Sequence, residues 1–147
     1  MRTWKPRQPV VLVVDDDPDI LQLLGMCLAA EGCDVREALT EREALQRLDR
    51  VDVLIVDQRM PHTSGTDLVV KARAQGFGGR VLIISGSRDA LVDARRTLAD
   101  GFLAKPIGPR ELSKEVERLF YLNVPMLVCS RPSRTDSGSD LDPRFAR

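Results

Sequence analysis

Several features that mark specialised proteins are scarce or missing in this chain of 147 residues. Aromatic residues make up 4% of it, and the three cysteines are odd in number and show no CxxC spacing. Free thiols in a reducing cytoplasm are therefore the expectation. The chain has no hydrophobic run of the roughly 18–20 residues that a membrane span needs. The 22 Lys and Arg residues balance the 22 Asp and Glu residues, so net charge gives no reason to expect binding to nucleic acid or to a membrane.

What the chain does contain is a regular alternation of short β-branched runs and amphipathic helical segments. The composition, 43% hydrophobic and 30% charged, suits one globular domain with a single core. Continuous apolar runs rich in Val and Ile predict buried strands, and apolar residues at helical spacing predict helices. The expected strands are 10–14, 33–37, 51–56, 80–84 and 101–104. The expected helices are 20–28, 40–48, 64–75, 90–98 and the segment that begins at Pro109.

This alternation predicts a doubly wound α/β fold, in which helices cover both faces of a five-stranded parallel sheet. We expect the folded domain to span residues 9–121. Residues 1–8, which include Trp4, are expected to form a mobile arm. The polar segment 122–147 is rich in Ser, Arg, Asp and Pro, and we expect a flexible tail without an output domain.

Polar residues follow the strands at the points where those strands are predicted to end. Asp15 and Asp16 follow the first strand, Asp57 the third, Ser85 the fourth and Lys105 the fifth. The carboxyl ends of parallel strands lie at one edge of the sheet, and ligands bind there. Three carboxylates, one hydroxyl and one ammonium group are therefore expected to converge at that edge.

The residue types at this edge narrow the chemistry. Carboxylates a few ångström apart repel one another unless one takes up a proton or a cation lies between them. Carboxylate oxygens suit Mg²⁺, which favours phosphate oxygens among its remaining ligands. An aspartate is also an established nucleophile toward phosphorus, and Lys105 and Ser85 could donate to the phosphoryl oxygens. The set therefore predicts Mg²⁺-assisted phosphorylation of an aspartate.

With these residues in order, the sequence resembles a response-regulator receiver domain of two-component signalling. The segments that carry the resemblance are "VVDDDP", "VDQRMPHTSG", "IISG" and "GFLAKP". The resemblance implies a flavodoxin-like fold with sheet order 2-1-3-4-5. It also implies that Asp57 is the phosphoacceptor, and that Asp15, Asp16, Asp57 and the backbone carbonyl of Arg59 hold Mg²⁺.

The resemblance further implies a switch and a set of partners. Ser85 would be the switch hydroxyl, Phe102 the switch aromatic, and Lys105 the lysine that contacts the phosphoryl group. A histidine kinase or phosphotransfer protein would supply the phosphoryl group, and the domain would catalyse its own phosphorylation and dephosphorylation without being a classical enzyme. The domain would signal by contact with a downstream target protein. The resemblance also allows a homodimer through the face formed by the fourth helix, fifth strand and fifth helix.

Structural alternatives exist for each of these residues. Asp15, Asp16 and Asp57 could be solvated loop residues, Lys105 a surface lysine and Phe102 part of the core. Ser85 could cap the next helix. Asp17 precedes a proline, and this pair is typical of a helix N-cap followed by a first-turn proline. His62 lacks a partner at metal-ligand spacing and is expected to be an exposed loop residue.

The sequence is also compatible with two other functions. Asp15 and Asp17 also resemble the nucleophile motif of haloacid-dehalogenase phosphatases, although a later acidic pair for Mg²⁺ is missing before the tail. A receiver that acts as an interaction module without phosphorylation would contain the same residues. We expect a stand-alone receiver that signals by protein–protein contact, although a fragment of a longer regulator would have the same sequence features.

Overall fold

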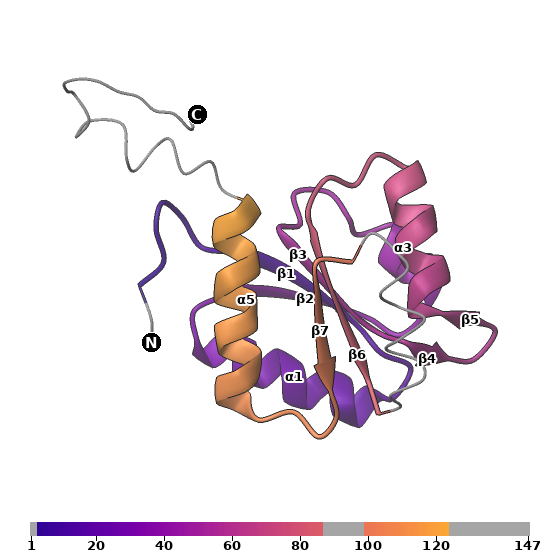
Figure 1. Cartoon of the computed structure of the whole chain (residues 1–147), viewed down its shortest axis with the longest axis horizontal. Helices are drawn as coiled ribbons and strands as arrows, with labels where there is room; N and C mark the ends of the chain where they lie inside the picture. Colours follow the sequence, from indigo (N-terminus) through magenta and orange to yellow (C-terminus); the bar gives the residue numbers. More distant parts are fainter. Residues whose placement is uncertain (1–2, 87–98, 124–147) are drawn as a thin grey trace.

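The computed structural model of the chain describes residues 3–86 and 99–123. A parallel sheet with strand order β2-β1-β3-β6-β7 forms its centre (Figure 1). The strands of this sheet are β1 (Val10–Val14), β2 (Asp34–Ala38), β3 (Val53–Asp57), β6 (Arg80–Ser85) and β7 (Gly101–Ala104). When these five strands alone are counted, the order is 2-1-3-4-5, so the predicted doubly wound fold is confirmed.

The helices begin within about two residues of the predicted positions. They are α1 (Pro18–Ala30), α2 (Glu41–Leu45), α3 (Gly65–Ala74) and α5 (Pro109–Asn123). The side chains of Asp17, Thr40 and Ser64 each accept a hydrogen bond from a backbone N–H in the first turn of α1, α2 and α3, as N-caps do. The helix α2 is shorter than the predicted segment 40–48. The helix expected over 90–98 and the segment beyond 123 lie outside the described residues.

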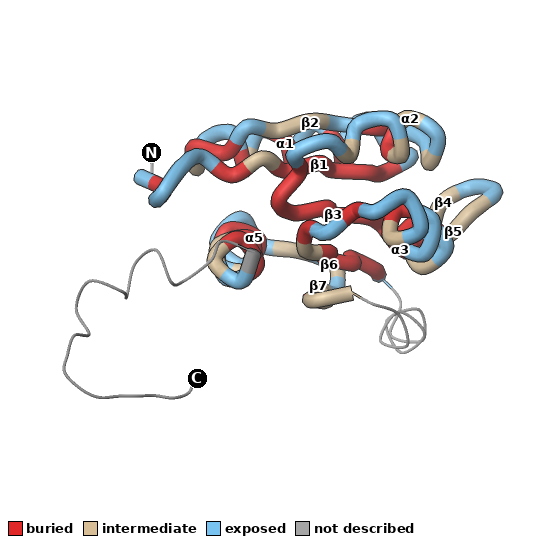
Figure 2. The backbone as a smooth tube through the Cα atoms, turned by 90° about the horizontal axis from the view of Figure 1, so that it is seen from above, coloured by how far each residue is buried: buried red, intermediate tan, exposed pale blue. Residues whose placement is uncertain are grey.

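Two apolar layers hold the helices against opposite faces of the sheet. Figure 2 shows the sheet edge-on, with α5 on one face and α3 on the other. One core joins α1 and α5 to side chains such as Val11 and Ile55. The other core joins α2 and α3 to the alternate side chains of the same strands, such as Leu12 and Leu54, because successive strand residues point to opposite faces. None of the helices in the described ranges is long and apolar enough to cross a membrane.

A short hairpin between β3 and α3 is not among the elements that the sequence predicts. Its strands are β4 (Arg59–Met60) and β5 (Thr63–Ser64), which pair antiparallel and project beyond the main sheet (Figure 1). His62 lies in the turn of the hairpin with a positive φ of 67°. Two-residue strands carry no hydrophobic run, so periodicity gives no signal for them.

The amino-terminal arm corrects a second expectation. Trp4 is packed against α5, with 8% of its surface exposed. Its indole ring lies edge-on to Phe120 and stacked on Tyr121, and its Nε1 donates to the carbonyl of Glu31 at 2.7 Å. The expectation that Trp4 lies in a mobile arm was therefore wrong, because an aromatic surface on a distant helix covers the indole.

Arg7 adds a polar contact to the same arm. Its guanidinium donates two hydrogen bonds to Asp52, at 2.8 and 2.6 Å, and lies 5.5 Å from the centre of the Phe120 ring. The Asp52 carboxylate is buried just before β3 and also accepts from the backbone N–H of Val10. This bidentate pair joins the arm to the amino ends of β1 and β3.

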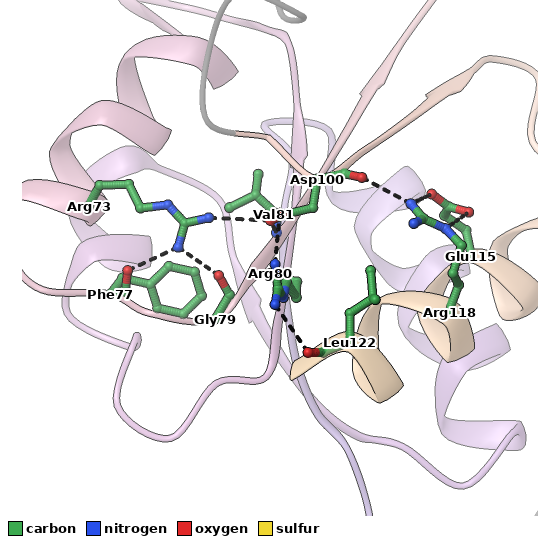
Figure 3. Close-up of polar contacts among 9 residues, drawn as sticks. All are labelled: Arg73, Phe77, Gly79, Arg80, Val81, Asp100, Glu115, Arg118 and Leu122. Atoms are coloured by element: carbon green, nitrogen blue, oxygen red, sulfur yellow. Dashed lines mark hydrogen bonds and ion pairs between the residues drawn. The ribbon is translucent and has the colours of Figure 1, made fainter. Parts of the chain in front are cut away.

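A second polar cluster lies at the amino ends of β6 and β7 (Figure 3). The Asp100 carboxylate accepts from Arg73, Arg80 and the backbone N–H of Val81, at 2.9–3.3 Å. Arg118 of α5 donates to the Asp100 carbonyl, and Arg80 donates to the carbonyl of Leu122. These contacts connect α3, β6, β7 and α5 at the edge opposite the carboxyl ends of the strands.

Candidate functional site

The carboxyl ends of the strands bring the predicted polar residues to one edge of the sheet. Asp57 is the last residue of β3 and Ser85 the last residue of β6. Asp15 directly follows β1, and Lys105 directly follows β7. The backbone N–H of Lys105 donates to the Ser85 carbonyl at 2.9 Å, which extends the pairing of β6 and β7 to the edge.

The acidic side chains meet closely enough to share one cation. Asp15, Asp16 and Asp57 each offer a carboxylate oxygen within 4.8 Å of the others. The Lys105 ammonium lies 3.5 Å from Asp57 Oδ2 and 3.7 Å from Asp15 Oδ2. The three carboxylates outnumber the single ammonium group, so the cluster carries a net negative charge.

Burial makes this charge costly. Asp15 is 2% exposed and Asp57 is 9% exposed, whereas Asp16 is open to solvent. Desolvation raises the pKa of Asp57 above its ordinary value, opposed mainly by Lys105. Desolvation likewise raises the pKa of Asp15, opposed by the hydrogen bond from the backbone N–H of Asp17. A bound cation would offset the same cost for both carboxylates.

Backbone groups orient the two buried carboxylates. The N–H of Asp17 donates to Asp15 Oδ1 at 2.9 Å, and the N–H of Arg59 lies 3.4 Å from Asp57 Oδ1. Asp17 itself accepts from the N–H of Asp19 and caps α1, so its predicted capping role is confirmed. The aspartate triplet therefore divides into two members of the acidic cluster and one helix cap.

Gln58 and the start of α3 support Asp57, a role that the sequence does not predict. The Gln58 side chain is buried and accepts from the backbone N–H of Thr66 at 3.0 Å, while its carbonyl accepts from the N–H of Gly65 at 3.0 Å. A Cβ atom on Gly65 would lie 2.9 Å from the Asp57 carbonyl oxygen and 3.1 Å from Gln58 Cα. Only glycine allows α3 to approach the end of β3 this closely.

The two predicted switch residues lie on the last two strands. Ser85 is fully buried at the end of β6. Phe102 of β7 is partly buried and packs against the core on the α3 side of the sheet. The peptide bond between Lys105 and Pro106 is cis. His62 is exposed in the hairpin turn, in agreement with the expectation of a loop residue.

The residues of the site lie within a segment that matches a known protein family. Residues 11–117 match the family model described as the response regulator receiver domain. The chain belongs to the response-regulator receiver family. Asp17, which a haloacid-dehalogenase mechanism would use, is instead the cap of α1 in this receiver domain.

Curated relatives and solved structures are similar to this receiver domain over most of its length. The response regulator protein PilR of Pseudomonas aeruginosa is 34% identical over 78% of this chain and 26% of its own length. A putative transcriptional regulator of Haloferax volcanii is 36% identical over 76% of this chain and 19% of its own length. A CheY-like receiver domain protein of Methanospirillum hungatei has a TM-score of 0.73 and 27% identity, over 80% of this chain and 97% of that one. The chain thus spans less than a third of these two curated relatives.

The donor set of this receiver domain fits the Mg²⁺ that such domains typically bind. Carboxylate oxygens of Asp15, Asp16 and Asp57 lie close enough together to bind one cation, and no nitrogen or sulfur donor is among them. A set of oxygen donors that is open to solvent on the side of Asp16 suits a hard cation that retains bound water. The net negative charge of the cluster supports the same assignment.

Proposed function

We propose that this receiver domain accepts a phosphoryl group on Asp57 from a phosphohistidine of a histidine kinase or phosphotransfer protein. The observation that carries the proposal is the position of the Asp57 carboxylate, which lies 3.5 Å from the Lys105 ammonium and within 4.8 Å of carboxylate oxygens of Asp15 and Asp16. A nucleophile that is placed beside a fixed cation and a cation-binding cluster is equipped for phosphoryl transfer. Asp15, Asp16, Asp57 and the carbonyl of Arg59 would hold Mg²⁺.

The phosphoryl group is transferred by an in-line displacement. One oxygen of Asp57 forms a bond to phosphorus while the bond from phosphorus to the donor nitrogen breaks, and that nitrogen keeps the electron pair. Lys105 stabilises the negative charge on the phosphoryl oxygens. When bound, Mg²⁺ supplies further charge neutralisation at the same oxygens. Attack of water on the acyl phosphate later returns the free carboxylate and releases phosphate.

Phosphorylation would change the conformation of the part of the sheet that contains Ser85 and Phe102. In the proposed active state the Ser85 hydroxyl donates a hydrogen bond to a phosphoryl oxygen, and Phe102 moves inward with it. Ser85 is the last residue of β6, and Phe102 lies on the neighbouring strand β7. The new hydrogen bond stabilises one of two pre-existing conformations. The face that we expect to change is that of β7, α5 and the helix predicted over 90–98, and this face would then bind a target protein or a second copy.

Intact-mass analysis of the purified chain with acetyl phosphate tests this function. The wild-type chain is expected to gain one phosphoryl group in the presence of Mg²⁺. It is expected to gain none when EDTA replaces Mg²⁺ in the reaction. Asp57→Asn is expected to gain none, and Asp49→Asn, whose carboxylate is 91% exposed, serves as the matched control. An equal adduct on Asp57→Asn, or none on the wild-type chain, contradicts the proposal. Partner binding that is unchanged in Asp57→Asn would favour the phosphorylation-independent module instead.

A further inference from the structure

Glu41 connects three elements next to the site without touching the acidic cluster. It is the first residue of α2, and its carboxylate is 20% exposed. Glu41 Oε2 accepts from the Thr63 hydroxyl of β5 at 2.6 Å, and Glu41 Oε1 accepts from the Lys71 ammonium of α3 at 2.7 Å. Both oxygens of one carboxylate are therefore engaged by neighbours 22 and 30 residues away.

The hairpin that Glu41 contacts leads directly to the proposed metal site. Thr63 pairs with Met60, and Ser64 pairs with Arg59, in the β4–β5 ladder. Arg59 is two residues from Asp57, and its backbone N–H lies 3.4 Å from Asp57 Oδ1. The position of β5 therefore sets the position of the Arg59 backbone through the ladder.

The two ends of this loop are held by different contacts. On the side of β3, the Gln58 side chain holds the loop to the start of α3 through Thr66. On the side of β5, the Thr63 hydroxyl holds it to Glu41. The hydrogen bond to a carboxylate is of the charge-assisted kind, which is shorter and stronger than a bond between neutral groups. Lys71 and Thr63 also lower the pKa of Glu41, so the carboxylate stays ionised at neutral pH.

We propose that Glu41 is a positioning residue for phosphoryl transfer, which fixes the β4–β5 hairpin through Thr63 and so holds the Arg59 carbonyl at the metal site. The inference rests on the proposed function of Asp57 and extends it to a residue outside the cluster. Groups that orient metal ligands from outside the coordination sphere commonly change metal affinity or activity by about 10- to 100-fold when they are removed. Neither the motif segments nor the strand ends of the sequence contain Glu41.

Four variants separate positioning from general stability. Glu41→Ala and Thr63→Val each remove the hydrogen bond, from opposite sides. Glu41→Gln keeps an oxygen acceptor for the Thr63 hydroxyl and loses only the charge that Lys71 faces. Arg42→Ala changes the next, exposed residue of the same helix and is the matched control. The measured quantities are Mn²⁺ affinity from the free-ion signal in electron paramagnetic resonance, the rate of phosphorylation by acetyl phosphate, and the midpoint of thermal unfolding.

Glu41→Ala and Thr63→Val are each expected to bind Mn²⁺ about tenfold more weakly and to take up phosphoryl about tenfold more slowly. Glu41→Gln is expected to recover most of both, and Arg42→Ala to match the wild-type chain. Metal-free unfolding midpoints close to wild type would show that the loss of affinity is not a loss of folding. If Glu41→Ala folds poorly, Thr63→Val carries the test, because valine preserves the shape of the threonine side chain.

The outcomes distinguish this inference from the function on which it rests. A wild-type chain that binds no Mn²⁺ and takes up no phosphoryl group overturns the proposed function and the inference together. A wild-type chain that does both, with Thr63→Val and Glu41→Ala indistinguishable from it, overturns the inference alone. Equal loss in Arg42→Ala would also overturn it, because the effect would then belong to α2 in general.

Discussion

The Lys105 ammonium lies 3.5 Å from one oxygen of Asp57, in a cluster that contains two further carboxylates. The same ammonium lies 3.7 Å from Asp15. One cation thus faces the two buried carboxylates, and it compensates part of their charge before any metal binds.

Lys105→Met is expected to separate phosphoryl transfer from metal binding. The variant loses the ammonium group that would stabilise the phosphoryl oxygens, so phosphorylation by acetyl phosphate should slow by about 100-fold. Mg²⁺ affinity should stay equal or rise, because a positive charge leaves the cluster. The rate is measured by intact mass and the affinity by calorimetry. Lys114→Met, which changes an exposed lysine of α5, is the control, and weaker Mg²⁺ binding in Lys105→Met would contradict this account.

The buried carboxylates predict that stability decreases with rising pH in the absence of a metal. Burial raises the pKa of Asp57, so the folded chain keeps this proton at pH values where the unfolded chain has released it. The free energy of unfolding therefore falls as pH rises from the ordinary carboxyl pKa through the raised folded value. Asp57→Asn should remove this penalty and gain about 0.5–2 kcal/mol at neutral pH.

The gain in Asp57→Asn should shrink below about pH 4, where the wild-type carboxyl is protonated in both states. Urea unfolding in EDTA at several pH values measures it, with Asp49→Asn as the exposed control. Addition of Mg²⁺ should stabilise the wild-type chain in proportion to its occupancy and should stabilise Asp57→Asn less. A gain in Asp57→Asn that is constant with pH would show that the buried charge is not its cause.

Gly65→Ala is expected to disturb the site from α3. The added Cβ would lie 2.9 Å from the Asp57 carbonyl oxygen and 3.1 Å from Gln58 Cα, and backbone atoms must shift to relieve these contacts. We expect a loss of about 1–3 kcal/mol in the free energy of unfolding together with slower phosphorylation. Gly78→Ala is the control, since a Cβ there meets no atom within 4 Å. Equal stability of the two variants would contradict the close approach of α3 to β3.

The amino-terminal arm is expected to contribute to stability at a distance from the site. Arg7→Ala leaves the buried Asp52 carboxylate without its bidentate partner, which should cost about 1–3 kcal/mol. Trp4→Ala removes an indole ring that packs on Phe120 and Tyr121, and should cost about 3 kcal/mol. Lys5→Ala, a change of an exposed side chain in the same arm, should stay within about 0.5 kcal/mol. Urea unfolding followed by circular dichroism measures all three, and equal midpoints would mean that the arm is not part of the folded unit.

The strands and the acidic edge were predictable because their signals are local. The run "VVLVV" gives β1 at its observed bounds, and parallel pairing then places Asp15, Asp57 and Lys105 at one edge. Other features depend on contacts between distant residues. The segment that contains Trp4 is polar and basic, and nothing in it shows that an aromatic surface on α5 will cover the indole. The tie between Glu41 and Thr63 crosses from α2 to a hairpin whose strands are too short to show periodicity.

The packing of Trp4 also affects where the domain can be cut. The family match runs from residue 11 to residue 117, and a chain trimmed to those limits would lose Trp4, Arg7 and the last turn of α5 with Phe120. Leu119 and Phe120 are fully buried, so the trimmed chain would expose apolar surface and leave Asp52 without its arginine. A segment that keeps Trp4, Arg7 and Phe120 is therefore expected to be more stable than one trimmed to the limits of the family match.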